Sequence, residues 1–276
     1  PNQLFVNYSG DGVVRFQEMA KEMNIAVKRG GMSASFVDAD SDGYLDLFIQ
    51  TYHEEPEGGR PSDVEITEED GNLQVPGELQ NSYFPYRDKE GNKKFVEAPQ
   101  EDLFFHNLGG GGFELVTDAG FIPGGTYGTG HLWWDMDHDL QADLYLGNDS
   151  HGPDLLYRKA PGKFVEAAAA TLPVTAWNTR GMVAADFNND LLMDCFIASS
   201  APLTFRERLA YGEPNSTDYY RIMGTPAARQ MPWNAMYANT GTALFREIAG
   251  PAGVRYTGTS WAAKAGDYDC DGRADL

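Results

Sequence analysis

The chain of 276 residues has little of three things that would point to other classes of protein. Its only two cysteines, Cys195 and Cys270, occupy different positions in separate repeats, so we expect no intrachain disulfide. It contains no run of 18 apolar residues, so we expect no transmembrane helix. Basic residues number 21 against 41 acidic ones and form no basic stripe, which argues against nucleic acid as a partner.

Long amphipathic helices are also missing from the pattern. No window of 11 or more residues keeps a convincing 3.6-residue hydrophobic period, with residues 16–27 as the nearest approach. Short runs of apolar, aromatic and β-branched residues alternate instead with glycine and asparagine. The sequence therefore predicts an all-β fold.

One motif occurs four times. Aspartate or asparagine stands at positions 1, 3 and 5 of a short loop, an aspartate follows at position 9, and an apolar run comes next. We call these stretches the Asp loops; they read DADSDGYLDLFI from Asp38, DMDHDLQADLYL from Asp135, DFNNDLLMDCFI from Asp186 and DYDCDGRADL from Asp267. Four copies in one register define a repeat architecture.

Each Asp loop belongs to a longer sequence unit of about 50 residues, which also holds an upstream apolar strand, a polar turn and a phenylalanine. Three to four short strands per unit are typical of a β-propeller blade. The strand after each loop is apolar on both faces and is predicted to be an inner strand. We expect a single propeller domain over residues 1–276, with blade units at about 1–50, 102–153, 154–200 and 232–276.

The carboxylates of an Asp loop would repel one another unless a cation lay among them. A hard cation with six to eight oxygen ligands removes that cost, and Ca²⁺ tolerates the irregular geometry of a loop better than Mg²⁺ does. An EF-hand does not fit, because position 12 is Ile49, Leu146 or Ile197 rather than glutamate. Up to four Ca²⁺ ions are therefore expected, with these ligands: Asp38, Asp40, Asp42, Asp46, Asp135, Asp137, Asp139, Asp143, Asp186, Asn188, Asp190, Asp194, Asp267, Asp269, Asp271 and Asp275.

Position 6 divides the loops into two pairs. The first and fourth loops have Gly43 and Gly272, which accept a positive φ easily. The second and third have Leu140 and Leu191, for which a positive φ would be costly, and the third also replaces one carboxylate with Asn188. Occupancy of these two loops is left open by the sequence, as is the possibility that the loops are only polar turns.

The residues also resemble a known family. The second unit matches its pattern at Leu103, Phe104, Asn107, Phe113, Val116, Thr117, Ala119, Gly120, Trp134 and 135–146. This pattern is similar to the FG-GAP/VCBS repeat family of β-propellers, known from integrin α-subunit heads, and in detail to its cartilage-acidic-protein-like group. The resemblance covers residues 1–50, 102–200 and 232–276 and implies a calcium-loaded propeller that usually binds partners rather than catalysing. Since four Asp loops are fewer than such a propeller usually carries, we expect an incomplete propeller.

Charge and calcium together suggest a compartment. The net charge is −20, and 15 of the acidic residues lie in the Asp loops, so four bound Ca²⁺ ions would leave about −12. Exposed loops of this kind fill only where Ca²⁺ is near millimolar, which favours a periplasmic or extracellular location.

Two inserts interrupt the repeat, at residues 51–101 and 200–232, and loops this long are usually functional or disordered. The first is acidic and carries an aromatic patch at residues 83–86. The second gathers arginine and tyrosine, which are enriched at interface hot spots. The partner-binding residues proposed there are Arg206, Arg208, Tyr219, Tyr220 and Arg221, although their aromatic rings could equally pin the insert to the blades.

Three functions are compatible with these observations. The leading expectation is a non-catalytic, calcium-rigidified interaction or scaffold module, such as an accessory subunit or adhesion head with protein partners. The second is a calcium-assisted polysaccharide lyase, which would need a base and a cation near the uronate carboxylate. The third is a carbohydrate-binding propeller that stacks sugars on Trp133, Trp134 or Trp177, although these side chains are more typical of a core between blades.

Overall fold

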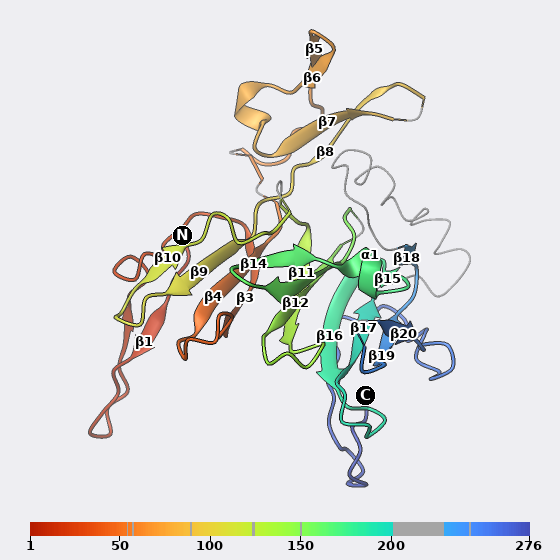
Figure 1. Cartoon of the computed structure of the whole chain (residues 1–276). Coiled ribbons are helices and arrows are strands. Elements are labelled where there is room, and N and C mark those ends of the chain that lie inside the picture. Colours follow the sequence, from red (N-terminus) through yellow and green to blue (C-terminus); the bar gives the residue numbers. More distant parts are fainter. Residues whose placement is uncertain are drawn as a thin grey trace.

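The computed structural model describes residues 1–53, 55–56, 58–88, 90–122, 125–149, 151–200, 229–242 and 244–276 (Figure 1). The described chain is all-β, as the sequence predicts, and is built from several antiparallel sheets, none of which is closed. Its one α-helix in these ranges is the short α1 (Ala168–Thr171). No described helix has the length and apolar character that crossing a membrane would require.

Three four-stranded sheets of the same design form the body of the molecule. In each, four strands follow one another as an antiparallel meander. The first sheet contains β3 (Gly31–Val37), β4 (Asp46–Thr51), β9 (Leu103–Asn107) and β10 (Phe113–Leu115). The second contains β11 (Gly128–Trp134), β12 (Asp143–Asn148), β13 (Leu155–Ala160) and β14 (Lys163–Glu166). The third contains β16 (Thr179–Ala185), β17 (Asp194–Ser199), β19 (Ala235–Asn239) and β20 (Phe245–Glu247).

The Asp loop of each sheet joins its first strand to its second. The strand that opens a sequence unit, such as β9, therefore lies in the sheet of the preceding Asp loop and not in that of its own unit. Sheet and sequence unit are offset by half a repeat. The hairpin of β1 (Phe5–Asn7) and β2 (Phe16–Glu18) resembles the outer half of a sheet, and the two-residue strands β15 (Thr175–Ala176) and β18 (Gln230–Met231) pair in parallel.

The repeat is preserved down to the pairing register. The last residue of the first strand pairs with the position-9 aspartate of the Asp loop: Val37 with Asp46, Trp134 with Asp143 and Ala185 with Asp194. At the fourth loop, an isolated bridge joins Gly266 to Asp275 in the same way. A bulge also interrupts the same pair of strands at the far end of all three sheets, at 31/33, 128/130 and 179/181.

The sheets lie side by side with apolar cores between them (Figure 1). The second strands β4, β12 and β17 are buried along their entire length, as predicted for inner strands apolar on both faces. Phe48 and Leu144 contribute to the core between the first and second sheets, while Leu156 and Ile197 lie in the core between the second and third. Burial of each such side chain contributes about 1.5–3 kcal/mol.

The first insert leaves the first sheet after β4 and folds into a small unit of its own. It contains β5 (Thr67–Glu69), β6 (Asn72–Gln74), the 3₁₀ helix η1 (Gly77–Leu79), β7 (Tyr83–Arg87) and β8 (Lys93–Glu97). Val64, Val75 and Tyr83 form a separate hydrophobic cluster within it. Loops this long are usually functional or disordered, and here the paired hairpins and this cluster give the described part of the insert an ordered fold. It stands at the end of the sheets away from the Asp loops (Figure 1).

Candidate cation-binding loops

The four Asp loops share one hydrogen-bonding scheme. The position-1 carboxylate accepts hydrogen bonds from the backbone N–H groups of positions 5 and 6, at 2.9–3.1 Å in every loop. The position-5 carboxylate accepts the N–H of position 7 at 2.8–2.9 Å. These local bonds wrap each loop around its own side-chain oxygens, as Asx turns do. The loop conformation is therefore specified by the spacing of the aspartates.

The backbone is left-handed at positions 4 and 6 of all four loops. At position 4 the residues are Ser41, His138, Asn189 and Cys270, with φ of 59–63°. At position 6, Gly43 and Gly272 have φ of 89° and 85°, while Leu140 and Leu191 have 67° and 68°. The leucines thus adopt the conformation that the sequence marked as costly for them, and 86 % of each remains exposed, so packing does not compensate that strain.

The position-9 aspartates differ from the others in burial. Asp46, Asp143 and Asp194 are each at most 1 % exposed. One oxygen accepts the backbone N–H of position 2, at 3.2 Å from Ala39 and 3.1 Å from Met136. The other accepts a backbone N–H of the third strand, at 2.8–2.9 Å. The position-9 carboxylate therefore fastens the loop to the sheet, whatever else it binds.

Burial also changes the acidity of these carboxyls. It raises the pKa of Asp143 to about 6, with further repulsion from Asp137 and Asp139. It raises the pKa of Asp46 and Asp194 in the same direction, again with like-charged loop aspartates contributing. Each loop end is thus a place where negative charge is unfavourable, and a cation would relieve that cost.

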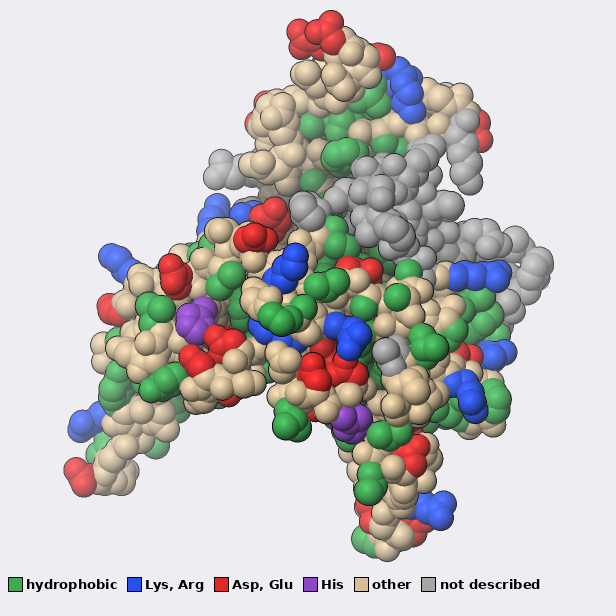
Figure 2. Space-filling model, in the orientation of Figure 1, with side chains coloured by type: hydrophobic (Ala, Val, Ile, Leu, Met, Phe, Trp, Pro, Cys, Tyr) green, Lys and Arg blue, Asp and Glu red, His purple; other side chains and the backbone are tan. Residues whose placement is uncertain are grey.

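The structure brings many of the predicted ligands together. Ligand atoms lie within 4.8 Å of one another in three groups of described residues: Asp40, Asp42 and His106; Asp135, Asp137 and Asp143; Asp267, Asp269 and Asp271. Acidic side chains gather on the lower part of the sheets, where these loops lie (Figure 2). The third loop holds Asp186, Asn188, Asp190 and Asp194 in the same backbone scheme, with one carboxylate fewer.

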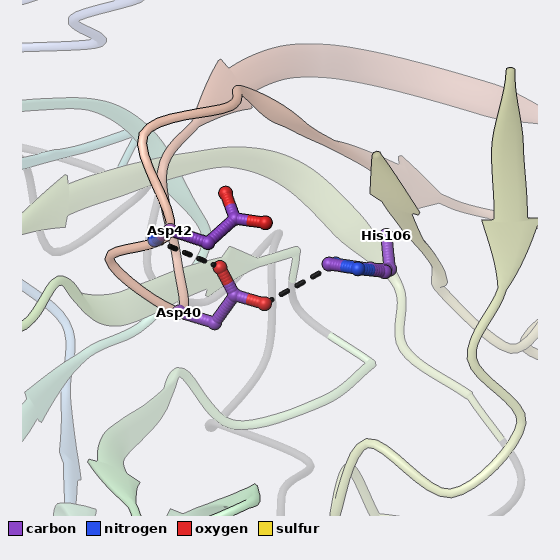
Figure 3. Close-up of side chains that lie close together, drawn as sticks. All are labelled: Asp40, Asp42 and His106. Atoms are coloured by element: carbon purple, nitrogen blue, oxygen red, sulfur yellow. Dashed lines mark hydrogen bonds and ion pairs between the residues drawn. The ribbon is translucent and has the colours of Figure 1, made fainter. Parts of the chain in front are cut away.

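Two side chains at the loops were not anticipated from the sequence. His106 Nδ1 lies 3.2 Å from Asp40 Oδ2 (Figure 3). The same nitrogen lies 3.2 Å from Asp46 Oδ1. In the second sheet, the Arg158 guanidinium forms an ion pair with Asp137. Both come from the third strand of their sheet, so only the cross-strand register places them beside the loop.

A second set of aspartates lies at the opposite end of the sheets, immediately before the third strands. Asp102 accepts the backbone N–H of Thr51 at 2.7 Å, and Asp154 accepts that of Asn148 at 2.8 Å. Asn234 accepts the backbone N–H of Ser199 in the same way, at 2.8 Å. Each of these residues pins the end of the second strand to the start of the third.

The other predicted site residues divide into two groups. Trp134 and Trp177 are buried, and Trp133 is partly buried in the core between the first and second sheets, so all three are core side chains. The predicted partner-binding residues Arg206, Arg208, Tyr219, Tyr220 and Arg221 lie outside the described residues. Cys195 and Cys270 are free, the first buried and the second exposed.

Together, the sheets and loops define a repeat protein whose unit is an antiparallel sheet with an Asp loop between its first two strands. A comparison with protein-family models identifies the repeat: residues 135–197 match the FG-GAP-like repeat. The matched segment runs from the second Asp loop to Ile197 in β17, so it contains the second and third loops. The chain therefore carries an FG-GAP-like repeat, as the sequence resemblance implied. No curated protein matches the chain.

Proposed function

We propose that the chain is a calcium-binding propeller-type module that binds a protein partner without catalysing a reaction. The observation that carries this proposal is the hydrogen-bonding scheme common to the four Asp loops, in which the position-1 carboxylate accepts the N–H of position 5. In three of these loops, two or three of the aspartates also bring ligand oxygens within 4.8 Å of one another. The three sheets are the blades of this propeller. Each loop lies at the same end of its sheet, so the cations would lie at one end of the module.

The donor set fits Ca²⁺. The loop aspartates supply only oxygen, which hard cations prefer, and Ca²⁺ tolerates the irregular geometry of a loop better than Mg²⁺ does. Asp38, Asp40, Asp42 and Asp46 would hold the ion in the first loop, and the equivalent residues would do so in the others. A bound Ca²⁺ would supply charge neutralisation and a cross-link between the loop and the buried position-9 aspartate. Its role is structural, since it would stiffen one end of the sheets.

The proposed setting is extracytoplasmic. Exposed loops with weak affinity for Ca²⁺ are occupied only where the ion is near millimolar, and bound Ca²⁺ would neutralise part of the acidic surface there. A protein partner would bind through the inserts, which depart from the repeat at 51–101 and 200–232. Simultaneous substitution of Arg206, Tyr220 and Arg221 by alanine should abolish partner binding and leave the melting temperature unchanged.

Calcium titration tests the central part of this proposal. We expect isothermal titration of chelator-treated protein to detect Ca²⁺ binding, and thermal unfolding to shift upward with Ca²⁺ concentration. The variant Asp38→Asn/Asp40→Asn should lose one binding event and part of the shift. The variant Asp11→Asn/Asp118→Asn is the matched control, because it removes the same charge from exposed sites outside the loops. An equal loss in both variants, or no binding to the wild type, would overturn the proposal.

A lyase is the second candidate, because one cluster of side chains contains groups that could act as acid and base. Tyr52 Oη donates to Asp149, whose other carboxylate oxygen lies 3.0 Å from His151 Nδ1, and this contact raises the pKa of His151. The cluster follows the C-terminal ends of β4 and β12, whereas the Asp loops precede their N-terminal ends. A six-residue strand spans about 20 Å, so a loop-bound Ca²⁺ would be too far away to hold a uronate at this cluster.

An absorbance assay separates the two candidates. We expect no unsaturated-uronide signal when the protein is incubated with a panel of acidic glycans in Ca²⁺. A signal that is present in wild type and disappears in the His151→Ala variant would overturn the proposal of a non-catalytic interaction module in favour of a lyase.

A further inference from the structure

One position on the third strand of each sheet faces the Asp loop, and it holds a different residue each time. It is His106 in β9, Arg158 in β13 and Ala238 in β19. The register makes these residues equivalent, because each follows the residue that is paired with the second residue of the neighbouring inner strand. In every sheet, the next residue donates its backbone N–H to the position-9 aspartate. The position is therefore fixed relative to the loop.

In the second sheet this position brings a permanent positive charge to the loop. The Arg158 guanidinium forms an ion pair with Asp137, the position-3 aspartate, whose side chain is 11 % exposed. Ligand atoms of Asp135, Asp137 and Asp143 lie within 4.8 Å of one another. Arginine keeps its charge at every accessible pH, so this pair does not depend on titration. One of the carboxylates proposed to bind calcium is thus already engaged by a cation of the chain itself.

The third sheet lacks both members of this pair. Its position 3 is Asn188 in place of aspartate, and its third-strand residue is Ala238 in place of arginine. As a result, the second and third loops carry the same formal charge of −3 when the facing residue is counted. The first loop has four carboxylates, and the imidazole of His106 lies beside two of them, Asp40 and Asp46.

We infer that Arg158 is a built-in counter-ion of the second Asp loop, which weakens calcium binding there and stabilises that loop when no calcium is bound. The weakening of calcium binding rests on the proposed calcium function, whereas the stabilisation of the calcium-free loop does not. A guanidinium beside the ion site repels Ca²⁺ and occupies an oxygen of Asp137. A unit charge a few ångströms from a divalent ion changes the affinity by at least about tenfold, even with the screening of bulk water.

The experiment compares Arg158→Gln with Arg15→Gln, an equal charge change at an exposed residue between β1 and β2. In isothermal titration, R158Q should bind Ca²⁺ at one site at least about tenfold more tightly than wild type, while R15Q stays at the wild-type value. The transplant gives the reverse test. Asn188→Asp should strengthen calcium binding at the third loop, and adding Ala238→Arg should cancel that gain.

Thermal unfolding in the presence of chelator tests whether Arg158 stabilises the calcium-free loop. R158Q should lower the melting temperature by about 2 °C relative to R15Q. Asp137→Asn/R158Q, which leaves the second loop with the same formal charge of −3 as the third, should restore it. Equal affinities and equal melting temperatures for R158Q and R15Q would overturn the inference. If wild type binds no Ca²⁺ and R158Q still melts lower in chelator, the calcium function fails and the counter-ion remains.

Discussion

The two ends of each sheet use the same residue type for opposite purposes. At the loop end, several aspartates crowd together, and their neighbours are largely other carboxylates. At the far end, one residue immediately before each third strand, Asp102, Asp154 or Asn234, accepts hydrogen bonds from neutral donors. Asp154 receives the hydroxyls of Tyr145 and Thr179 as well as a backbone N–H.

This difference shows that environment, and not residue type, decides what a buried aspartate does. A neutral set of donors can satisfy one carboxyl completely, and the third sheet replaces that carboxyl with the amide of Asn234. Several carboxylates in one loop repel one another even when backbone N–H groups are bound to them, so the loop end favours a nearby positive charge. Arg158 supplies it from the chain in one sheet, and Ca²⁺ would supply it elsewhere.

The largest loss of stability should come from removing the aspartate at position 9 of an Asp loop. Asp143→Ala removes the acceptor for the backbone N–H groups of Met136 and Lys159, both next to buried positions. Leaving two such donors without partners should lower the free energy of unfolding by about 2–5 kcal/mol. Urea denaturation in the presence of chelator measures this change independently of calcium.

Asp139→Ala is the matched control for that prediction, since it removes a carboxylate from an exposed position of the same loop. We expect it to change the free energy of unfolding in chelator by less than about 1 kcal/mol. Similar losses in the two variants would mean that the position-9 aspartate has no special structural role.

Asp154, at the far end of the second sheet, should make the free energy of unfolding depend on pH. Burial raises the pKa of Asp154 to about 7, above its ordinary value of 3.8. The protonated form is favoured in the folded state, so this carboxyl's contribution to stability is fully present below about pH 4 and is lost as the pH rises through about 7. Asp154→Asn, which copies Asn234, should remove that dependence.

The stability of Asp154→Asn relative to wild type should therefore rise between pH 4 and pH 7, by on the order of 2–4 kcal/mol, and then level off. Chemical denaturation across this pH range gives the difference curve. Asp118→Asn, at an exposed residue, should give a flat curve. A flat curve for Asp154→Asn as well would show that its carboxyl is ionised in the folded protein at the same pH as in the unfolded one.

Much of this comparison could be predicted from the sequence, because it depends on local spacing. Alternating aspartates set the loop, and the apolar run after position 9 predicted the buried inner strands β4, β12 and β17. The FG-GAP-like match at residues 135–197 agrees with the resemblance drawn from those residues. Glycine at position 6 also indicated a left-handed backbone, which Gly43 and Gly272 adopt.

The rest depends on contacts between distant residues. Which strands share a sheet follows from pairing across a repeat boundary, so the sequence unit and the sheet are offset. His106 and Arg158 reach their loops from the third strand, at a sequence separation of 66 and 21 residues from Asp40 and Asp137. A search for basic residues directly after the next unit's Asp-Leu-(Phe/Leu)-(Phe/Tyr) strand would have found both. The folding of the first insert rests on a cluster of its own that no periodicity revealed.

The smallest effect should come from the outer tip of the loop end, where leucine takes a conformation suited to glycine. The carboxylate of Asp135 accepts the N–H of Leu140 at 3.0 Å, and that bond holds the leucine at a φ of 67°. Leu140→Gly should relieve the strain without loss of packing and raise the free energy of unfolding by about 0.5–1 kcal/mol. Leu108→Gly, at an exposed leucine without a positive φ, should lower it instead. Thermal unfolding of the two variants measures this difference. If both variants lose stability, the hydrogen bonds to the loop aspartates do not hold Leu140 in a strained left-handed conformation.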